Sequence, residues 1–183
     1  MYQDFKTKAE GVGAEVFRFL TRAEALEFIL QLLLKSGVTA NTGSFAAWAD
    51  GSFLDTLDQT ELSARVPGLR FDVDRQVAAD SLVGISEMDW ALADTGSLVA
   101  NLNSVSKRLV STLATINIAL IGTNHVLPDK SALFRKITPA TSRYIGFITG
   151  PSRTADIERV LTIGVHGPKR LVIVCVDEMG GAN

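Results

Sequence analysis

A run of polar residues near the C-terminus carries the side chains best suited to binding an anion. Gly150 ends an apolar run at residues 144–149 that is short enough and rich enough in β-branched and aromatic residues to be a buried strand; Ser152, Arg153 and Thr154 follow it. A guanidinium can hold a carboxylate or a phosphate through two hydrogen bonds, and the hydroxyls add further donors. Two interpretations are open: these residues bind a small anionic ligand, or the arginine pairs with a nearby carboxylate while the hydroxyls cap a helix.

The residues after Thr154 favour a helix start. The segment 155–158, ADIE, places carboxylates in what would be the first helical turn, just after a hydroxyl. A helix N-terminus offers unpaired N–H groups and the positive end of the helix dipole. We therefore expect residues 150–154 to form an anion site between a strand and a helix.

A second polar turn, residues 94–97 (DTGS), lies between two short apolar segments. In open α/β sheets, ligands bind where loops leave the carboxyl ends of strands, and both polar loops have that character. If the loops lie side by side, Asp94 could act as a base or nucleophile, although an aspartate in a turn commonly bonds its own backbone. The predicted ligand-binding residues are Thr95, Gly96, Gly150, Ser152, Arg153, Thr154 and His166.

His166 lies between Gly164 and Gly167, so we expect it in a turn and outside the core. Its imidazole could bind a ligand or carry a proton. It could equally hold one chain connection against another through a backbone carbonyl. His125, beside apolar residues, has no feature that indicates a role.

Alternating strands and helices are expected to position these residues. A capping box, Thr21 with Glu24, opens a helix that extends to Lys35. Further helices are expected at residues 53–66, 77–83 and 130–137, and strands at 14–20, 44–49, 70–73, 90–93, 98–102, 116–121, 144–149 and 171–176. The pattern predicts a single domain, residues 1–183, of α/β class: an open, largely parallel sheet with helices on both faces and one hairpin inserted near residues 90–102.

Composition excludes several function classes. The net charge is −2 and the basic residues are scattered, so we expect no nucleic-acid partner. The most apolar helical run, residues 26–34, contains Glu27 and Gln31 and is too short to span a membrane. With no apolar signal core at the N-terminus, the sequence predicts a cytoplasmic protein.

Cysteine and histidine are scarce. The only cysteine, Cys175, lies inside an apolar run, where a small buried hydrophobic side chain is expected. An intrachain disulfide is impossible, which suits a reducing compartment, and an iron–sulfur cluster generally needs four cysteine ligands. Two histidines are too few for a typical zinc site, so we expect no metal and no cofactor in this chain.

Three segments resemble the LUD-domain family, in its lactate-utilisation protein C (LutC) group. They are GISEMDWALADTGSLV at 84–99, KRLVSTLATINIALIG at 107–122 and ITGPSRTADIERVLTIGVHGPKRLVIVCVD at 148–177. The resemblance implies the fold of the sugar-phosphate isomerase and CoA-transferase superfamily (NagB/RpiA/CoA-transferase-like). It also implies a role as one subunit of a complex that oxidises L-lactate to pyruvate, with the iron–sulfur clusters on partner subunits.

Other roles stay open beside this one. The superfamily fold also suits a stand-alone enzyme acting on a phosphorylated or CoA-linked small molecule through the loop at residues 150–154. A third possibility is a purely structural or regulatory partner protein.

The sequence also departs from its relatives, which often have Pro and His where Ala114 and Asn117 stand, and Glu where Asp94 stands. Asparagine can hydrogen-bond but cannot exchange a proton near neutral pH.

Overall fold

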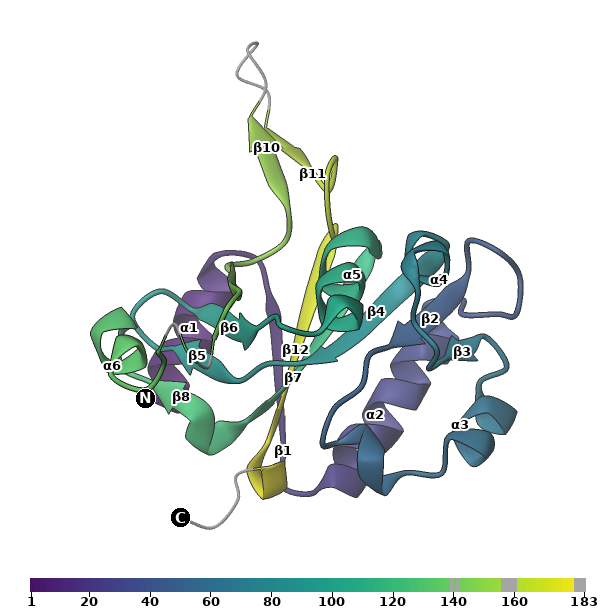
Figure 1. Cartoon of the computed structure of the whole chain (residues 1–183), viewed down its shortest axis with the longest axis horizontal. Coiled ribbons are helices and arrows are strands. Elements are labelled where there is room, and N and C mark those ends of the chain that lie inside the picture. The colour runs from purple at the N-terminus through teal and green to yellow at the C-terminus, as the bar shows by residue number, and fades with distance from the viewer. Residues whose placement is uncertain (139, 141, 156–160, 180–183) are drawn as a thin grey trace.

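A six-stranded parallel sheet forms the centre of the molecule. The computed structural model describes residues 1–138, 140, 142–155 and 161–179. The strand order is β1 (Glu15–Phe19), β12 (Arg170–Val176), β7 (Ile116–Gly122), β4 (Ser81–Glu87), β2 (Phe45–Trp48) and β3 (Leu69–Arg70), every neighbouring pair being parallel (Figure 1). The two most buried strands, β7 and β12, are near-continuous apolar runs, as strands covered on both faces must be. The predicted α/β class is confirmed.

One face of this sheet is covered by α2 (Arg22–Lys35) and α3 (Gln59–Arg65). Ile29 and Leu33 of α2 pack in one cluster with Ile118 of β7 and Val172 of β12. The capping box at the start of α2 is present: the Thr21 hydroxyl accepts the N–H of Glu24, whose carboxylate accepts the N–H of Thr21. The local signal and the packed face therefore agree on this helix.

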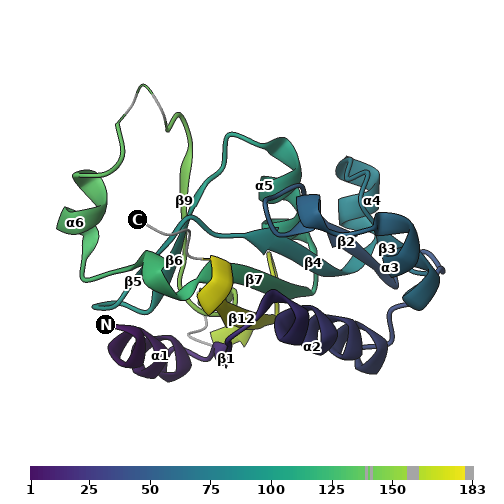
Figure 2. The ribbon, with the colours of Figure 1, turned by 90° about the horizontal axis from the view of Figure 1, so that it is seen from below.

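The opposite face carries α1 (Tyr2–Gly11), α4 (Arg75–Ala79), α5 (Val105–Leu113) and a second sheet. That sheet has the order β8 (Val126–Leu127), β5 (Trp90–Leu92), β6 (Ser97–Asn101) and β9 (Ile145–Ile148), with α6 (Lys130–Phe134) packed on it. Helices thus cover both faces of the central sheet, and the predicted hairpin is β5 with β6. Figure 2 shows α5 and β9 on the side of the sheet away from α2.

Two predicted helices differ from the structure in part: the one expected at 77–83 overlaps α4 but ends earlier, and the one expected at 155–158 does not begin at Ala155. Residues 81–83 belong to β4: Ser81 and Val83 pair with β2, Val83 also pairs with β7, and the helix before them ends at Ala79. Ala155 lies in β10 (Arg153–Ala155), which pairs antiparallel with β11 (Leu161–Ile163). The rest of the helix expected at 155–158 lies outside the described residues. The two strands form a ribbon that projects from the body of the molecule (Figure 1).

Smaller differences concern element ends. The helix expected at 53–66 is divided into a 3₁₀ turn, η1 (Leu54–Thr56), and α3, and the helix expected at 130–137 ends at Phe134. Short 3₁₀ turns η2 (Thr123–His125) and η3 (Asp177–Met179) follow β7 and β12. In the part of the chain that the structure describes, no helix is both long and apolar enough to cross a bilayer.

Two arginine–carboxylate pairs tie β12 and its C-terminal end to β1. Arg170 donates to both carboxylate oxygens of Glu15, at 2.5 and 2.8 Å, and Arg18 donates to both of Asp177, at 2.9 and 3.0 Å. The Arg170 hydrogen bonds hold the pKa of Glu15 below its ordinary value, and Arg18, with the Thr123 hydroxyl, does the same for Asp177. Both carboxylates are therefore more acidic in the folded protein.

We expect this pairing to make the protein sensitive to acid. A carboxyl whose pKa is lowered by folding adds stability above its unfolded pKa, and that stability is lost as pH falls towards the folded pKa. The urea midpoint should thus be flat above about pH 5 and fall below the ordinary values of 4.5 for Glu15 and 3.8 for Asp177. Urea titrations from pH 3 to 7 measure this. The variant Arg170→Gln should show a shallower acid slope, and an identical slope would contradict the assignment.

Candidate functional site

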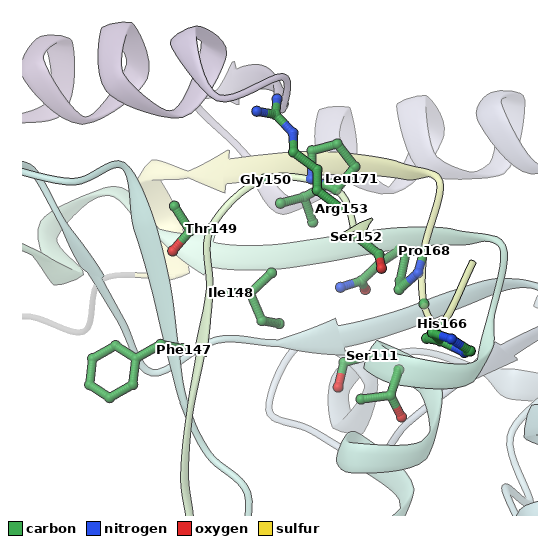
Figure 3. A pocket seen from close by; sticks show the side chains of 14 residues that line it. Ser111, Phe147, Ile148, Thr149, Gly150, Ser152, Arg153, His166, Pro168 and Leu171 are labelled. Atoms are coloured by element: carbon green, nitrogen blue, oxygen red, sulfur yellow. The ribbon is translucent and has the colours of Figure 1, made fainter. Parts of the chain in front are cut away.

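A cavity of about 420 Å³ lies where α5, β9 and the ends of two central strands meet (Figure 3). The residues that line it come from α5 and β7, from β9, the loop after it and the start of β10, and from β12 and the turn before it. They are Ser111, Thr112, Asn117, Phe147, Ile148, Thr149, Gly150, Pro151, Ser152, Arg153, His166, Gly167, Pro168 and Leu171. The cavity is thus built from segments that are distant in the sequence.

The cavity lies at the amino ends of the central strands. Asn117 is the second residue of β7 and stands beside Leu171, the second residue of β12, in the parallel register. The sequence predicts a loop at the carboxyl end of a strand, which holds for β9, whereas the same cavity borders the amino ends of β7 and β12. The loop of residues 150–154 leaves the carboxyl end of β9, but β9 belongs to the second sheet. The loop therefore lies at the amino ends of the central strands.

Backbone hydrogen bonds fix the loop against the turn before β12. The N–H of Ser152 donates to the carbonyl of Pro168 at 2.8 Å, and the N–H of Gly164 donates to the carbonyl of Ser152 at 2.9 Å. Gly150 has φ +70°, and a Cβ there would lie 2.4 Å from the carbonyl oxygen of Val12. The loop can therefore keep this backbone conformation only with glycine at residue 150. The same conformation places Ser152 beside the turn that contains the exposed His166.

Arg153 lines the cavity, but its guanidinium is directed outward. Its Nη2 donates to the carbonyl oxygen of Val12 at 2.6 Å, at the end of α1, and the side chain is exposed. Figure 3 shows the guanidinium pointing away from Ser111 and His166. Arg153 belongs to the ribbon strand β10, and Ala155, where the helix was expected to begin, still lies in that strand; the rest of the expected helix is outside the described residues. Thr154, next in β10, stands opposite Thr162 and is not among the lining residues.

The two polar loops lie side by side. The hydroxyl of Ser97 is 2.8 Å from that of Thr95 and 2.7 Å from that of Thr149, and Leu98 stands opposite Ile148 in the β6–β9 register. Gly96, however, is directed towards α1, where an added Cβ would lie 2.3 Å from the backbone nitrogen of Ala9.

Asp94 is exposed, and its N–H donates to the carbonyl of Pro128 at 3.1 Å. Neither Asp94 nor Thr95 nor Gly96 lines the cavity. The structure thus brings Gly150, Ser152, Arg153 and His166 together around it, and a catalytic role for Asp94 stays a prediction.

Asn117 is a polar lining residue that was not among the predicted ligand-binding residues. Its side chain is fully buried, and among the described residues neither its Oδ1 nor its Nδ2 has a hydrogen-bond partner. Leaving a buried polar group unpaired costs about 1–3 kcal/mol, so native proteins seldom tolerate it. The signal in the sequence was one amide inside the apolar run INIALIG. Ser111 and Thr112 had no comparable signal, because only the packing of α5 brings them to the cavity.

The charge of the lining limits what can bind. No carboxylate and no cysteine line the cavity within the described part of the chain, and its ionisable side chains are Arg153 at the rim and the exposed His166. Such a lining suits a neutral or anionic small molecule better than a cation. Across the described residues, no group of three or more histidine, cysteine or acidic side chains is placed to hold a metal ion.

A second hollow of about 390 Å³ lies at the carboxyl ends of the central strands. Its polar side chains include Glu87, Lys107 and His125. The carboxylate of Glu87 already accepts the N–H of Phe53 and the hydroxyl of Ser52. Because the carboxylate of Glu87 already has partners, this hollow gives less indication of a ligand than the cavity of Asn117 does.

Comparison with known proteins places this chain in a family. The model of the LUD domain matches residues 2–176. Lactate utilization protein C of Halalkalibacterium halodurans is 31% identical over 169 residues, covering 86% of this chain and 72% of that protein. The protein of the same name from Macrococcus caseolyticus is 30% identical over 160 residues, covering 83% and 68%.

A solved structure shares the fold at low sequence identity. The crystal structure of a DUF162 family protein from Deinococcus radiodurans superposes with a TM-score of 0.62 over 95% of this chain and 94% of that one, at 15% identity. The likeness at this identity supports the architecture alone. The family model spans nearly the whole chain, and two relatives at about 30% identity extend over most of it. The chain therefore belongs to the LUD-domain family.

Proposed function

We propose that this protein acts in lactate utilisation, as a subunit without an iron–sulfur cluster in a system that oxidises L-lactate to pyruvate. One observation carries the proposal: relatives named lactate utilization protein C match 86% and 83% of the chain. The cavity gives the chain a place to bind a small molecule, and its lack of acidic lining residues suits a carboxylate such as lactate.

Electron transfer would have to use partner subunits. The single cysteine, Cys175, is fully buried in β12, and burial raises the pKa of its thiol to about 12. A thiol that stays protonated at neutral pH is a poor metal ligand, and a cluster requires several such ligands. We therefore assign the redox centres to iron–sulfur partner chains and ligand binding or assembly to this one.

Deleting the gene tests the proposal. In a strain without a second copy, we expect loss of growth on L-lactate as the carbon source, unchanged growth on glucose, and rescue by the wild-type gene. The expectation follows because a complex that lacks one required subunit cannot oxidise its substrate. Undiminished growth on lactate would refute the role.

An anaerobic affinity purification tests the partners. The tagged full-length protein should bring down cysteine-rich chains and a broad visible absorption typical of iron–sulfur clusters. Recovery of the colourless chain alone would contradict the complex. It would favour the stand-alone enzyme that acts on a phosphorylated or CoA-linked molecule.

A further inference from the structure

The geometry points to a 2-hydroxy carboxylate as the ligand of the cavity, with Asn117 as the residue that recognises it. The carboxamide of Asn117 would donate a hydrogen bond from Nδ2 to the ligand's carboxylate and accept one at Oδ1 from its hydroxyl. This assignment rests on the proposed role in lactate utilisation. It adds the chemical group that the cavity recognises and the residue that binds that group.

The first step is the hydrogen-bonding capacity of Asn117. A carboxamide presents an N–H donor and a carbonyl acceptor side by side. In Asn117 both atoms are buried and unpartnered among the described residues, while the side chain borders the cavity. A ligand that hydrogen-bonds directly to both atoms must present an acceptor and a donor next to each other where it meets Asn117.

The second step is the chemistry of the ligand. In a 2-hydroxy acid the carboxylate and the hydroxyl stand on adjacent carbons, so one acceptor and one donor lie at the spacing of a single carboxamide. In the 2-keto acid of the same skeleton the hydroxyl is replaced by a carbonyl, which only accepts. The keto acid would leave Oδ1 of Asn117 unpaired, as would a carboxylate without a hydroxyl.

The third step is the remainder of the lining. Ile148 and Leu171 give the cavity apolar walls for the carbon substituent of the ligand, and no described lining residue repels a carboxylate. A volume of about 420 Å³ exceeds what lactate needs. We therefore assign the class of 2-hydroxy acids with short aliphatic side chains, in which lactate is a small member.

Helix α5 lies close against the sheet beside Asn117. Gly84 and Leu171 flank Asn117 in the sheet, in β4 and β12, and a Cβ at Gly84 would lie 2.1 Å from the carbonyl oxygen of Val110 in α5. The helix thus lies directly on the sheet next to the amide. Asn117, two residues of α5 and the loop after β9 border the same cavity.

Calorimetric titration of the purified full-length protein tests the assignment. The panel is L-lactate, 2-hydroxy-4-methylpentanoate, pyruvate, propionate and inorganic phosphate. We expect both hydroxy acids to bind about fivefold or more tightly than pyruvate and propionate, because an unpaired buried acceptor weakens binding by at least about that factor. Equal affinities for lactate and pyruvate, no binding of either hydroxy acid, or tighter binding of phosphate would each overturn the assignment.

Asn117→Leu separates recognition from folding. Leucine has nearly the same size and removes two unsatisfied polar atoms, so the unliganded variant should be as stable as the wild type or more stable. Its preference for hydroxy over keto acids should disappear. The control is Ser86→Ala, since Ser86 is also fully buried with an unpartnered Oγ in the described structure but does not line the cavity. A preference that survives Asn117→Leu, or disappears in Ser86→Ala, would overturn the role of Asn117.

These outcomes are independent of the growth test. If deletion abolishes growth on lactate while hydroxy and keto acids bind equally, the role in lactate utilisation stands and the assignment of Asn117 fails. If the hydroxy acids bind selectively and the deletion strain still grows on lactate, the site is confirmed and the proposed function fails.

Discussion

Gly96→Ala should lower the free energy of unfolding by about 2–5 kcal/mol, because two costs add at this residue. Gly96 has φ +67°, a conformation that costs an L-residue about 1 kcal/mol. Its Cβ would also lie 2.3 Å from the backbone nitrogen of Ala9 and 2.5 Å from the carbonyl carbon of Lys8. These are backbone atoms of α1 that cannot rotate aside, so the helix must move off the second sheet. Urea unfolding at pH 7 measures the loss.

Gly37→Ala separates the two costs. Gly37 has φ +83°, but nothing lies within 4 Å of where its Cβ would be, so this variant should lose only about 1 kcal/mol. Gly11→Ala, on α1 itself and also in open space, should cost nothing. If Gly96→Ala were no worse than Gly37→Ala, the close approach of α1 to the turn at residues 94–97 would be wrong.

For Gly96 the close approach of another group was predicted correctly, but the identity of that group was not. Thr-Gly in a turn after a strand indicates close approach of another group to the backbone, and we expected a ligand there. The approaching group is α1, which the chain places against this turn through the packing of Phe5 and Ala9 with Leu98. No local pattern connects residues 9 and 96, so the identity of the neighbour could not be inferred from the sequence.

Most elements were predictable because local signals and tertiary pairing agree. The capping box at Thr21 and the uninterrupted apolar runs of β7 and β12 each have one good local solution, and the fold uses it. Where the two conflict, pairing prevails. Thr154 precedes residues that are typical of a helix start, but it pairs with Thr162 in the ribbon. Ser81 continues a helical pattern, but it pairs with Phe45 in the central sheet.

The candidate site was partly visible for the same reason. The glycines and hydroxyls at 150–154 and around His166 mark loops, and these loops do line the cavity. The places of Asn117 and Leu171 in the cavity depend on strand order, and those of Ser111 and Thr112 depend on the position of α5. Strand order and helix position are both set by long-range packing. Asn117 therefore stood out as an amide in an apolar strand, but its cavity could not be inferred without the neighbouring β9 and α5.

The second large effect is expected for Gly84→Ala, since Gly84 determines how closely α5 lies on the sheet beside Asn117. An added Cβ would lie 2.1 Å from the carbonyl oxygen of Val110 and 2.8 Å from its carbonyl carbon, so α5 must shift outward. We expect a loss of about 3 kcal/mol or more in the free energy of unfolding. Ser111 and Thr112 follow Val110 on α5, so the cavity wall moves as well, and binding of a 2-hydroxy acid should weaken about tenfold or more.

Gly146→Ala is the matched control, because it is also a strand glycine whose added Cβ would have a near neighbour. That neighbour is the Cδ1 of Leu102, at 2.4 Å, the end of a side chain that can rotate. The control should therefore lose clearly less stability than Gly84→Ala when both are unfolded in urea. Equal losses would mean that overpacking in general, and not the backbone of α5, limits the residue at position 84. A Gly84→Ala protein with normal stability would show that α5 lies farther from β4 than the structure places it.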